Sequence, residues 1–147
     1  MFKRILVPVD GSEPSQHALQ TAGRMAAESG GQLRVLHVMD RAAYLTGYDP
    51  SGAASGALYD AMSSGARQVL ADAEAQARGA GVPVDSAMIN ELGTRLGDAV
   101  AQAAKDWGAD LIVVGTHGRS GPSRLLLGSG AEQIIRLAPV PVLVTRG

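Results

Sequence analysis

Two hydrophobic patterns alternate along the chain. Short apolar or alternating runs predict β-strands at residues 4–9, 33–38, 82–89, 110–115 and 142–145. Longer stretches with an apolar residue every three or four positions predict helices at residues 13–29, 58–78, 96–107 and 129–137. This order favours an α/β fold: an open, twisted, parallel five-stranded sheet with four helices on both of its faces.

The ends of several predicted elements carry recognisable signals. Ser12 is expected to cap the first helix, and the glycine pair at 30–31 is expected to end it. Ser129 and Glu132 have the spacing of a capping box at the start of the last helix. Residues 40–56 show no clear period, so we expect a long mobile loop there.

The composition restricts the class of protein. The chain has 147 residues, 46% hydrophobic and 18% charged, which suits one globular domain over residues 1–147. Its net charge of -1 provides no broad positive field for nucleic acid or anionic lipid, and the absence of cysteine excludes disulfides and thiolate metal sites. The apolar stretch at the start is too short for a signal peptide, and no run approaches the roughly 18 apolar residues of a membrane span. We therefore expect a cytoplasmic protein without a nucleic acid or membrane partner.

Two strand ends carry candidate binding residues, because ligands of an open parallel sheet bind outside the carboxyl ends of the strands, where the strand order reverses. The first strand ends in PVDGS at residues 8–12. The Asp10 carboxylate could accept hydrogen bonds from a ribose, with Val9 as an apolar wall, or Asp10 could simply stabilise the turn. The second strand ends in HVMD at residues 37–40, where Val38 could cover a flat ring or pack in the core.

Glycines gather after the fourth strand. The sequence GTHGRSG covers residues 115–121, and GSG at residues 128–130 opens the last predicted helix. Glycine lets backbone N–H groups approach an anion closely, and a helix N-terminus adds free N–H groups and a positive dipole. Arg119 and Arg124 could offset phosphate charge, or could lie in solvent. The segment therefore predicts a phosphate-binding loop.

Two common phosphate-binding motifs do not occur in the sequence. The Walker pattern G-x-x-x-x-G-K-[ST] cannot form, because the only lysines are Lys3 and Lys105. No G-x-G-x-x-G follows the first strand. Walker-type NTPases and ordinary dinucleotide enzymes are thereby excluded.

The spacing that remains is G-x2-G-x9-G-S, from Gly115 through Gly118 to Gly128 and Ser129. It resembles the motif of the universal stress protein family, in its ATP-binding branch. The resemblance covers nearly the whole chain, through ILVPVDGS, LRVLHVMD, GADLIVVGTHGRSG and LLLGSGAEQIIRLAPVPVLV. It implies a Rossmann-like fold of the adenine nucleotide alpha hydrolase-like type, in a single universal stress protein domain. It also implies bound ATP, with any Mg²⁺ carried by the nucleotide.

The resemblance also implies roles for individual residues. Val9 and Val38 would flank the adenine, and Asp10 would bind the ribose. The backbone around Val114 and the motif glycines would hold the triphosphate. With Pro8 and the loop arginine, the predicted nucleotide contacts are Pro8, Val9, Asp10, Val38, Val114, Gly115, Gly118, Arg119, Gly128, Ser129 and Gly130. Family members commonly carry a branched residue where this chain has Gly130, which predicts a looser loop that bears on nucleotide affinity.

The candidate residues favour binding over fast turnover. The glycine-rich segment has no lysine and no evident base beside it, so no catalytic residue is predicted. The three histidines, His17, His37 and His117, lack the spacing of a helical ligand pair, so no dedicated metal site is predicted.

The last predicted strand suggests a partner. It lies close to the end of the sequence and can form a sheet edge with open N–H and C=O groups. The family resemblance implies a homodimer joined there, with Val140, Val142 and Val144 near the contact. The alternative is an edge kept short by Pro139 and Pro141.

Three functions follow from these residues. The first is an ATP-binding stress-response protein, whose nucleotide changes the phosphate-binding loop and the loop after the second strand, and whose downstream partner prefers one state. The second is a slow ATPase or a phosphoryl or adenylyl transferase that uses Asp10, His117 and Arg119. The third is a nucleotide-free dimerisation protein.

Overall fold

The computed structural model describes residues 1–39, 53–90, 94–116 and 129–146. Strands and helices alternate along them, as the hydrophobic pattern predicts. The elements are β1 (Arg4–Pro8), α1 (Glu13–Ser29), β2 (Gln32–Val38), α3 (Ala53–Arg78), β3 (Val84–Ile89), α4 (Leu96–Trp107), β4 (Leu111–Thr116), α5 (Ser129–Leu137) and β5 (Val142–Arg146).

The five strands form one parallel sheet in the order β3-β2-β1-β4-β5. The chain builds outward from β1 through β2 to β3, then crosses to the other side of β1 and adds β4 and β5. The predicted fold is confirmed, with the strand order reversing between β1 and β4. This reversal fixes where a ligand site is expected.

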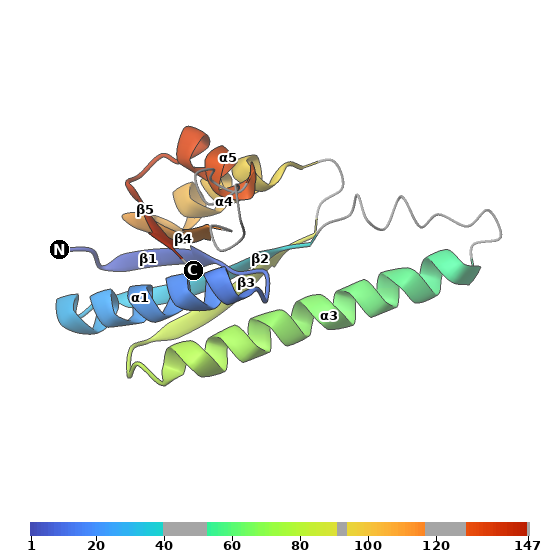
Figure 1. The fold of residues 1–147 in the computed structure, drawn as a ribbon, viewed down its shortest axis with the longest axis horizontal. Helices are drawn as coiled ribbons and strands as arrows, with labels where there is room; N and C mark the ends of the chain where they lie inside the picture. The colour runs from blue at the N-terminus through green and yellow to red at the C-terminus, as the bar shows by residue number, and fades with distance from the viewer. Residues whose placement is uncertain (40–52, 91–93, 117–128, 147) are drawn as a thin grey trace.

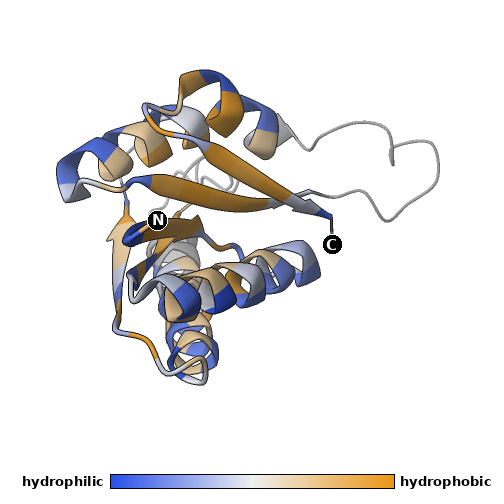
Figure 2. Ribbon diagram, turned by 90° about the vertical axis from the view of Figure 1, so that its left-hand side faces the viewer, coloured by the Kyte–Doolittle hydropathy of each residue, from blue (hydrophilic) through white to orange (hydrophobic). Residues whose placement is uncertain are grey.

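Two helices cover each face of the sheet (Figure 1). Alternate residues of each strand point to opposite faces, so Ile5 and Val7 pack with α1 and α3, while Leu6 packs with α4 and α5. Figure 2 shows the apolar strands between helices whose outer surfaces are hydrophilic. Each face of the sheet therefore has its own hydrophobic core.

The ends of α1 agree with the predicted signals. The Ser12 hydroxyl accepts a hydrogen bond from the Ser15 amide at 3.3 Å, as an N-cap does. Gly30 ends the helix in the left-handed conformation, with φ 69°. The carboxyl end of β1 is thereby joined to a helix whose first turn is rigidly placed.

Two predicted boundaries differ from the structure by two residues or more, and the others agree to within one residue. Helix α3 begins at Ala53, whereas the apolar period predicts a start at residue 58. Two alanines supply helix propensity at residues 53–54 before a clear apolar face begins, so the period misses this turn. The rest of the predicted loop lies outside the described residues. Strand β3 begins at Val84 rather than at residue 82, because Pro83 lacks an N–H and only accepts a hydrogen bond, from Leu33.

Candidate functional site

The carboxyl ends of β1 and β4 lie on either side of the reversal in strand order. The two strands pair Ile5 with Leu111 and Leu6 with Ile112. Beyond this ladder, β1 leads into the turn at Asp10 and β4 ends at Thr116. The ends of the first and fourth predicted strands are therefore brought to the same place in the fold.

Asp10 lies exposed in the turn between β1 and α1. Its Oδ1 accepts a hydrogen bond from the Ser12 amide at 2.9 Å, and its own amide donates to the Ser15 hydroxyl at 3.4 Å. Gly11 permits the turn with φ +82°, a conformation that side chains rarely adopt. Asp10 thus stabilises the turn, as one of the two predicted interpretations proposes, and the residue is exposed.

Val9 and Val38 lie on opposite faces of the sheet. Val9 is buried in the α1–α3 core, and Val38 packs in part against the α4–α5 core. A ring flanked by both side chains would therefore have to lie across the end of the sheet rather than over one face. Pro8 precedes Val9 as the last residue of β1 and pairs with Leu36 of β2.

His37 is a residue that the sequence did not single out for this site. Its Nδ1 lies 2.8 Å from the carbonyl oxygen of Val9, across from β2 to β1. Because a carbonyl only accepts, Nδ1 must carry the proton. The His37 ring thus fixes the carboxyl end of β1, directly before Asp10. A polar residue within the apolar carboxyl end of the second strand, after Val35 and Leu36, was the signal available in the sequence.

Gly115 has a packing role that the sequence did not suggest. A Cβ added there would overlap the backbone carbonyl of Pro14, in the first turn of α1. The close approach at this glycine is therefore made by α1, not by a phosphate on that side of the sheet. Val114 is buried on the other face, and its carbonyl accepts from the Thr145 hydroxyl at 3.3 Å.

Gly130 lies within α5, whereas the loop that the sequence predicts to be looser lies outside the described residues. An added Cβ would lie 2.6 Å from Cδ2 of Leu96, at the start of α4. One turn further along α5, Gln133 packs on Gly97, whose added Cβ would lie 2.7 Å from the Gln133 Cβ. Glycines on both helices let α4 and α5 begin side by side.

The remaining predicted contacts fall mostly outside the described residues. These are Gly118, Arg119 and Gly128, as well as His117. Ser129 is described as the first residue of α5, where a helix presents free N–H groups and the positive end of its dipole. The predicted role of Ser129 as a cap stays a prediction.

Two kinds of feature are absent from the described residues. No cluster of three His, Asp or Glu side chains there is arranged to hold a metal ion. Among the described helices, none combines the length and the hydropathy that crossing a membrane would take.

Known proteins are similar to this chain in both sequence and fold. A profile of the universal stress protein family matches residues 1–146. Universal stress protein YxiE of Bacillus subtilis is 32% identical, over 99% of this chain and 100% of its own length. The crystal structure of a protein from the same family from Burkholderia pseudomallei is 32% identical, with a TM-score of 0.76 over 98% of this chain and 96% of its own.

A further structure is of a universal stress protein in complex with cAMP. It is 26% identical to this chain, with a TM-score of 0.68 over 99% of this chain and 97% of its own.

Proposed function

Because the chain belongs to the universal stress protein family, we propose that it is a cytoplasmic, ATP-binding stress-response protein that acts as a dimeric, nucleotide-dependent regulatory module. The observation that carries the proposal is the position of an exposed carboxylate, Asp10, at the reversal in strand order between β1 and β4. Open α/β sheets bind their ligands there. The related protein with bound cAMP supports an adenine nucleotide as the ligand.

The residues of this chain fit a nucleotide in two respects. Asp10 offers a carboxylate acceptor for ribose hydroxyls on a turn that is already hydrogen-bonded. Helix α5 begins at Ser129, next to the start of α4, and its free N–H groups favour an anion. In the proposed complex, the backbone at Gly118 and Gly128 binds the phosphates and Arg119 adds positive charge. Bound ATP would bring negative charge, with its own Mg²⁺, to this end of the sheet.

The proposed role is regulation through binding rather than rapid turnover. A nucleotide that binds one arrangement of the loops more tightly raises the population of that arrangement. A downstream partner that prefers the same arrangement then binds more tightly in the presence of ATP.

The first test is to denature freshly purified protein and identify any released nucleotide by chromatography and mass spectrometry. A thermal shift experiment with Mg-ATP accompanies it. We expect released ATP, or a higher melting temperature with ATP, because a ligand of the native state stabilises that state. An empty protein that is indifferent to ATP would favour the nucleotide-free dimerisation protein instead. Phosphate release above background, lost in His117→Ala, would favour the slow enzyme.

The second test concerns the glycine loop. Gly128→Val should abolish ATP binding and leave the domain folded, because its side chain fills the space that the phosphates approach. The matched control is Gly65→Val in α3, where an added Cβ meets nothing within 4 Å. Equal ATP affinity in Gly128→Val and the native protein would contradict the phosphate-binding loop.

The proposed dimer uses β5, an edge strand of the sheet. Val142 and Val144 pack against the α4–α5 core and remain partly exposed, and Val140 lies just before the strand. Edge strands of this kind pair readily with a second chain. Sedimentation equilibrium should give the mass of two chains for the native protein and of one chain for Val140→Asp. A native protein with the mass of one chain would contradict this part of the proposal.

A further inference from the structure

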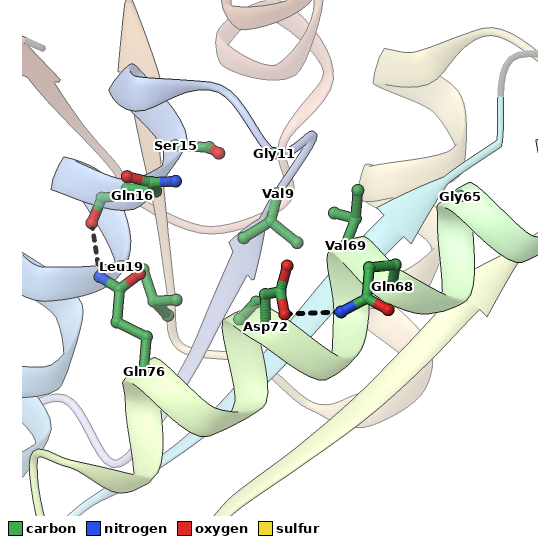
Figure 3. Close-up of a pocket in the computed structure, with 11 residues that line it drawn as sticks. Val9, Gly11, Ser15, Gln16, Leu19, Gly65, Gln68, Val69, Asp72 and Gln76 are labelled. Carbon is green, nitrogen blue, oxygen red and sulfur yellow. Dashed lines mark hydrogen bonds between the residues drawn. The ribbon is translucent and has the colours of Figure 1, made fainter.

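A groove separates α1 from α3 beneath the turn that follows β1 (Figure 3). Its volume is about 320 Å³, within the range of small-molecule sites. Val9 and Gly11 form the end nearest the turn, and the two helices form the walls. The groove therefore lies on the α1–α3 face of the sheet, apart from the start of α5.

Two contacts between its walls set the width of the groove. At one end, the Gln76 side-chain amide of α3 donates to the Gln16 carbonyl of α1 at 3.0 Å. Near the turn, an added Cβ on Gly11 would lie 3.2 Å from Cγ2 of Val69, so the turn packs against α3. One turn beyond Val69, toward the start of α3, Gly65 leaves open space, with nothing within 4 Å of an added Cβ (Figure 3). The groove is preformed rather than opened by a ligand.

The lining combines an apolar floor with one charged group. Val9, Leu19 and Ala73 are buried side chains that form the floor. Among the described residues that line the groove, Asp72 is the only charged one, and its side chain lies between α3 and Val9 in Figure 3. Its Oδ1 accepts from the Gln68 side-chain amide at 2.8 Å, which orients the carboxylate. Within the described part of the chain, no arginine or lysine forms an ion pair with Asp72.

We propose that this groove is a second binding site, for a small organic ammonium ligand with an apolar chain. The ammonium group donates to the Asp72 carboxylate, and charge assistance strengthens that hydrogen bond. The apolar chain lies on Val9, Leu19 and Ala73 and is removed from water. An anionic ligand is disfavoured, because it would face the Asp72 carboxylate, and the described lining residues include no compensating cation.

The test uses three probes that share a butyl-type chain and differ in charge: butylammonium, butan-1-ol and butyrate. Each is titrated into the full chain and followed by ¹H–¹⁵N NMR. We expect butylammonium to shift the amide signals of Gly11, Gly65 and the Gln76 side chain in a saturable way. Butan-1-ol should bind about tenfold more weakly, since it lacks the charge-assisted hydrogen bond, and butyrate should not bind. Equal shifts with butan-1-ol, or no saturable shift with any probe, would overturn the proposal.

Two variants separate the site from general effects of charge. Asp72→Asn keeps an acceptor for Gln68 and should weaken butylammonium binding about tenfold. Its control is Asp106→Asn in α4, where Gln102 and Asp106 form the same pair at 2.8 Å away from the groove. If both variants bind like the native protein, the carboxylate of Asp72 has no part in recognition and the proposal fails.

A third variant tests the space itself. Gly65→Leu places a side chain in the open part of the groove and should abolish butylammonium binding, while Gly65→Ala should retain it. Both changes add a better helix former to α3, so neither is expected to unfold the domain. Unaltered binding in Gly65→Leu would place the ligand elsewhere and overturn the proposal.

Discussion

The two ends of the sheet use their polar residues differently. At the amino end, the guanidinium groups of Arg4 and Arg34 lie 4.6 and 4.8 Å from the ring centre of Trp107. Arg34 also makes two hydrogen bonds to Asp85, at 2.8 and 2.9 Å, and Asp110 accepts from the Arg4 amide at 3.1 Å. These side chains bind one another or, in the case of Asp110, the backbone at the start of β1, so their contribution is to the stability of the fold.

At the carboxyl end, the polar side chains form hydrogen bonds with backbone groups in and beside the turn at Asp10. His37 binds the Val9 carbonyl, and Ser12 and Ser15 bind the turn at Asp10, whose side chain stays exposed. This difference assigns stability to the amino end of the sheet and ligand binding to the carboxyl end. Substitutions at the amino end should lower the stability of the fold and leave nucleotide binding unchanged. Substitutions at the carboxyl turn should weaken nucleotide binding and leave the stability largely unchanged.

The largest effect should come from Trp107→Ala. The ring is buried, with 8% of its surface exposed, and two arginines stack on it. Removing it should lower the free energy of unfolding by about 3–5 kcal/mol, from lost burial and lost cation–π contacts. Urea denaturation measures the loss, and ATP affinity of the folded fraction should be unchanged. A matching loss of affinity in that fraction would break the division between the two ends.

Gly115→Val tests the exception to this division. Gly115 lies at the carboxyl end, yet its added side chain would overlap the Pro14 carbonyl. We expect a loss of about 3 kcal/mol in the free energy of unfolding, the upper range for overpacking, because backbone must move. Gly65→Ala is the control and should raise stability by roughly 0.5–1 kcal/mol. If native stability persists in Gly115→Val, α1 does not pack on β4 as described.

A smaller effect is expected from His37→Leu, which leaves the Val9 carbonyl without its partner. One hydrogen bond contributes about 1 kcal/mol, so ATP affinity should fall roughly fivefold by isothermal titration calorimetry. The matched change at the amino end is Arg34→Met, which should leave ATP affinity as it is. Equal weakening of ATP binding by the two variants would contradict the difference between the two ends of the sheet.

The smallest effect concerns acid. The hydrogen bond from Arg34 lowers the pKa of the Asp85 carboxyl, chiefly because it stabilises the charged form. Its contribution to stability is therefore complete above the usual pKa, about 3.9, and disappears as the pH falls through the lower pKa of the folded state.

Half of the Asp85 side chain is exposed, so screening limits this contribution to less than about 1 kcal/mol. The difference in stability between the native protein and Asp85→Asn should shrink below about pH 4, as measured by urea denaturation at each pH. If this difference in stability grew on acidification, it would contradict a lowered pKa of Asp85 in the folded state.

Local patterns predicted most of the fold, because the spacing of apolar residues and the capping of helices depend on residues that are close in the sequence. Ser12 and Gly30 mark both ends of α1 as expected. The start of α3 was missed, since its first turn has propensity without an apolar face. The site was harder to predict. The sequence indicates that Gly115 needs space, but only the tertiary structure shows that Pro14 takes that space.

Contacts between distant segments explain the other gaps. His37 lies 28 positions from Val9 along the chain, and Arg34 lies 51 positions from Asp85. No periodicity relates such pairs. Strand order alone brings β1 between β2 and β4, and only then do these side chains meet their partners.

The most direct test of the central claim is ATP binding by Asp10→Ala, measured by isothermal titration calorimetry beside a urea denaturation curve. We predict about tenfold weaker binding, from the loss of a charged acceptor for the ribose, with at most about 1 kcal/mol lost in stability from the turn. Native affinity for ATP in a folded Asp10→Ala protein would contradict a nucleotide site at this end of the sheet.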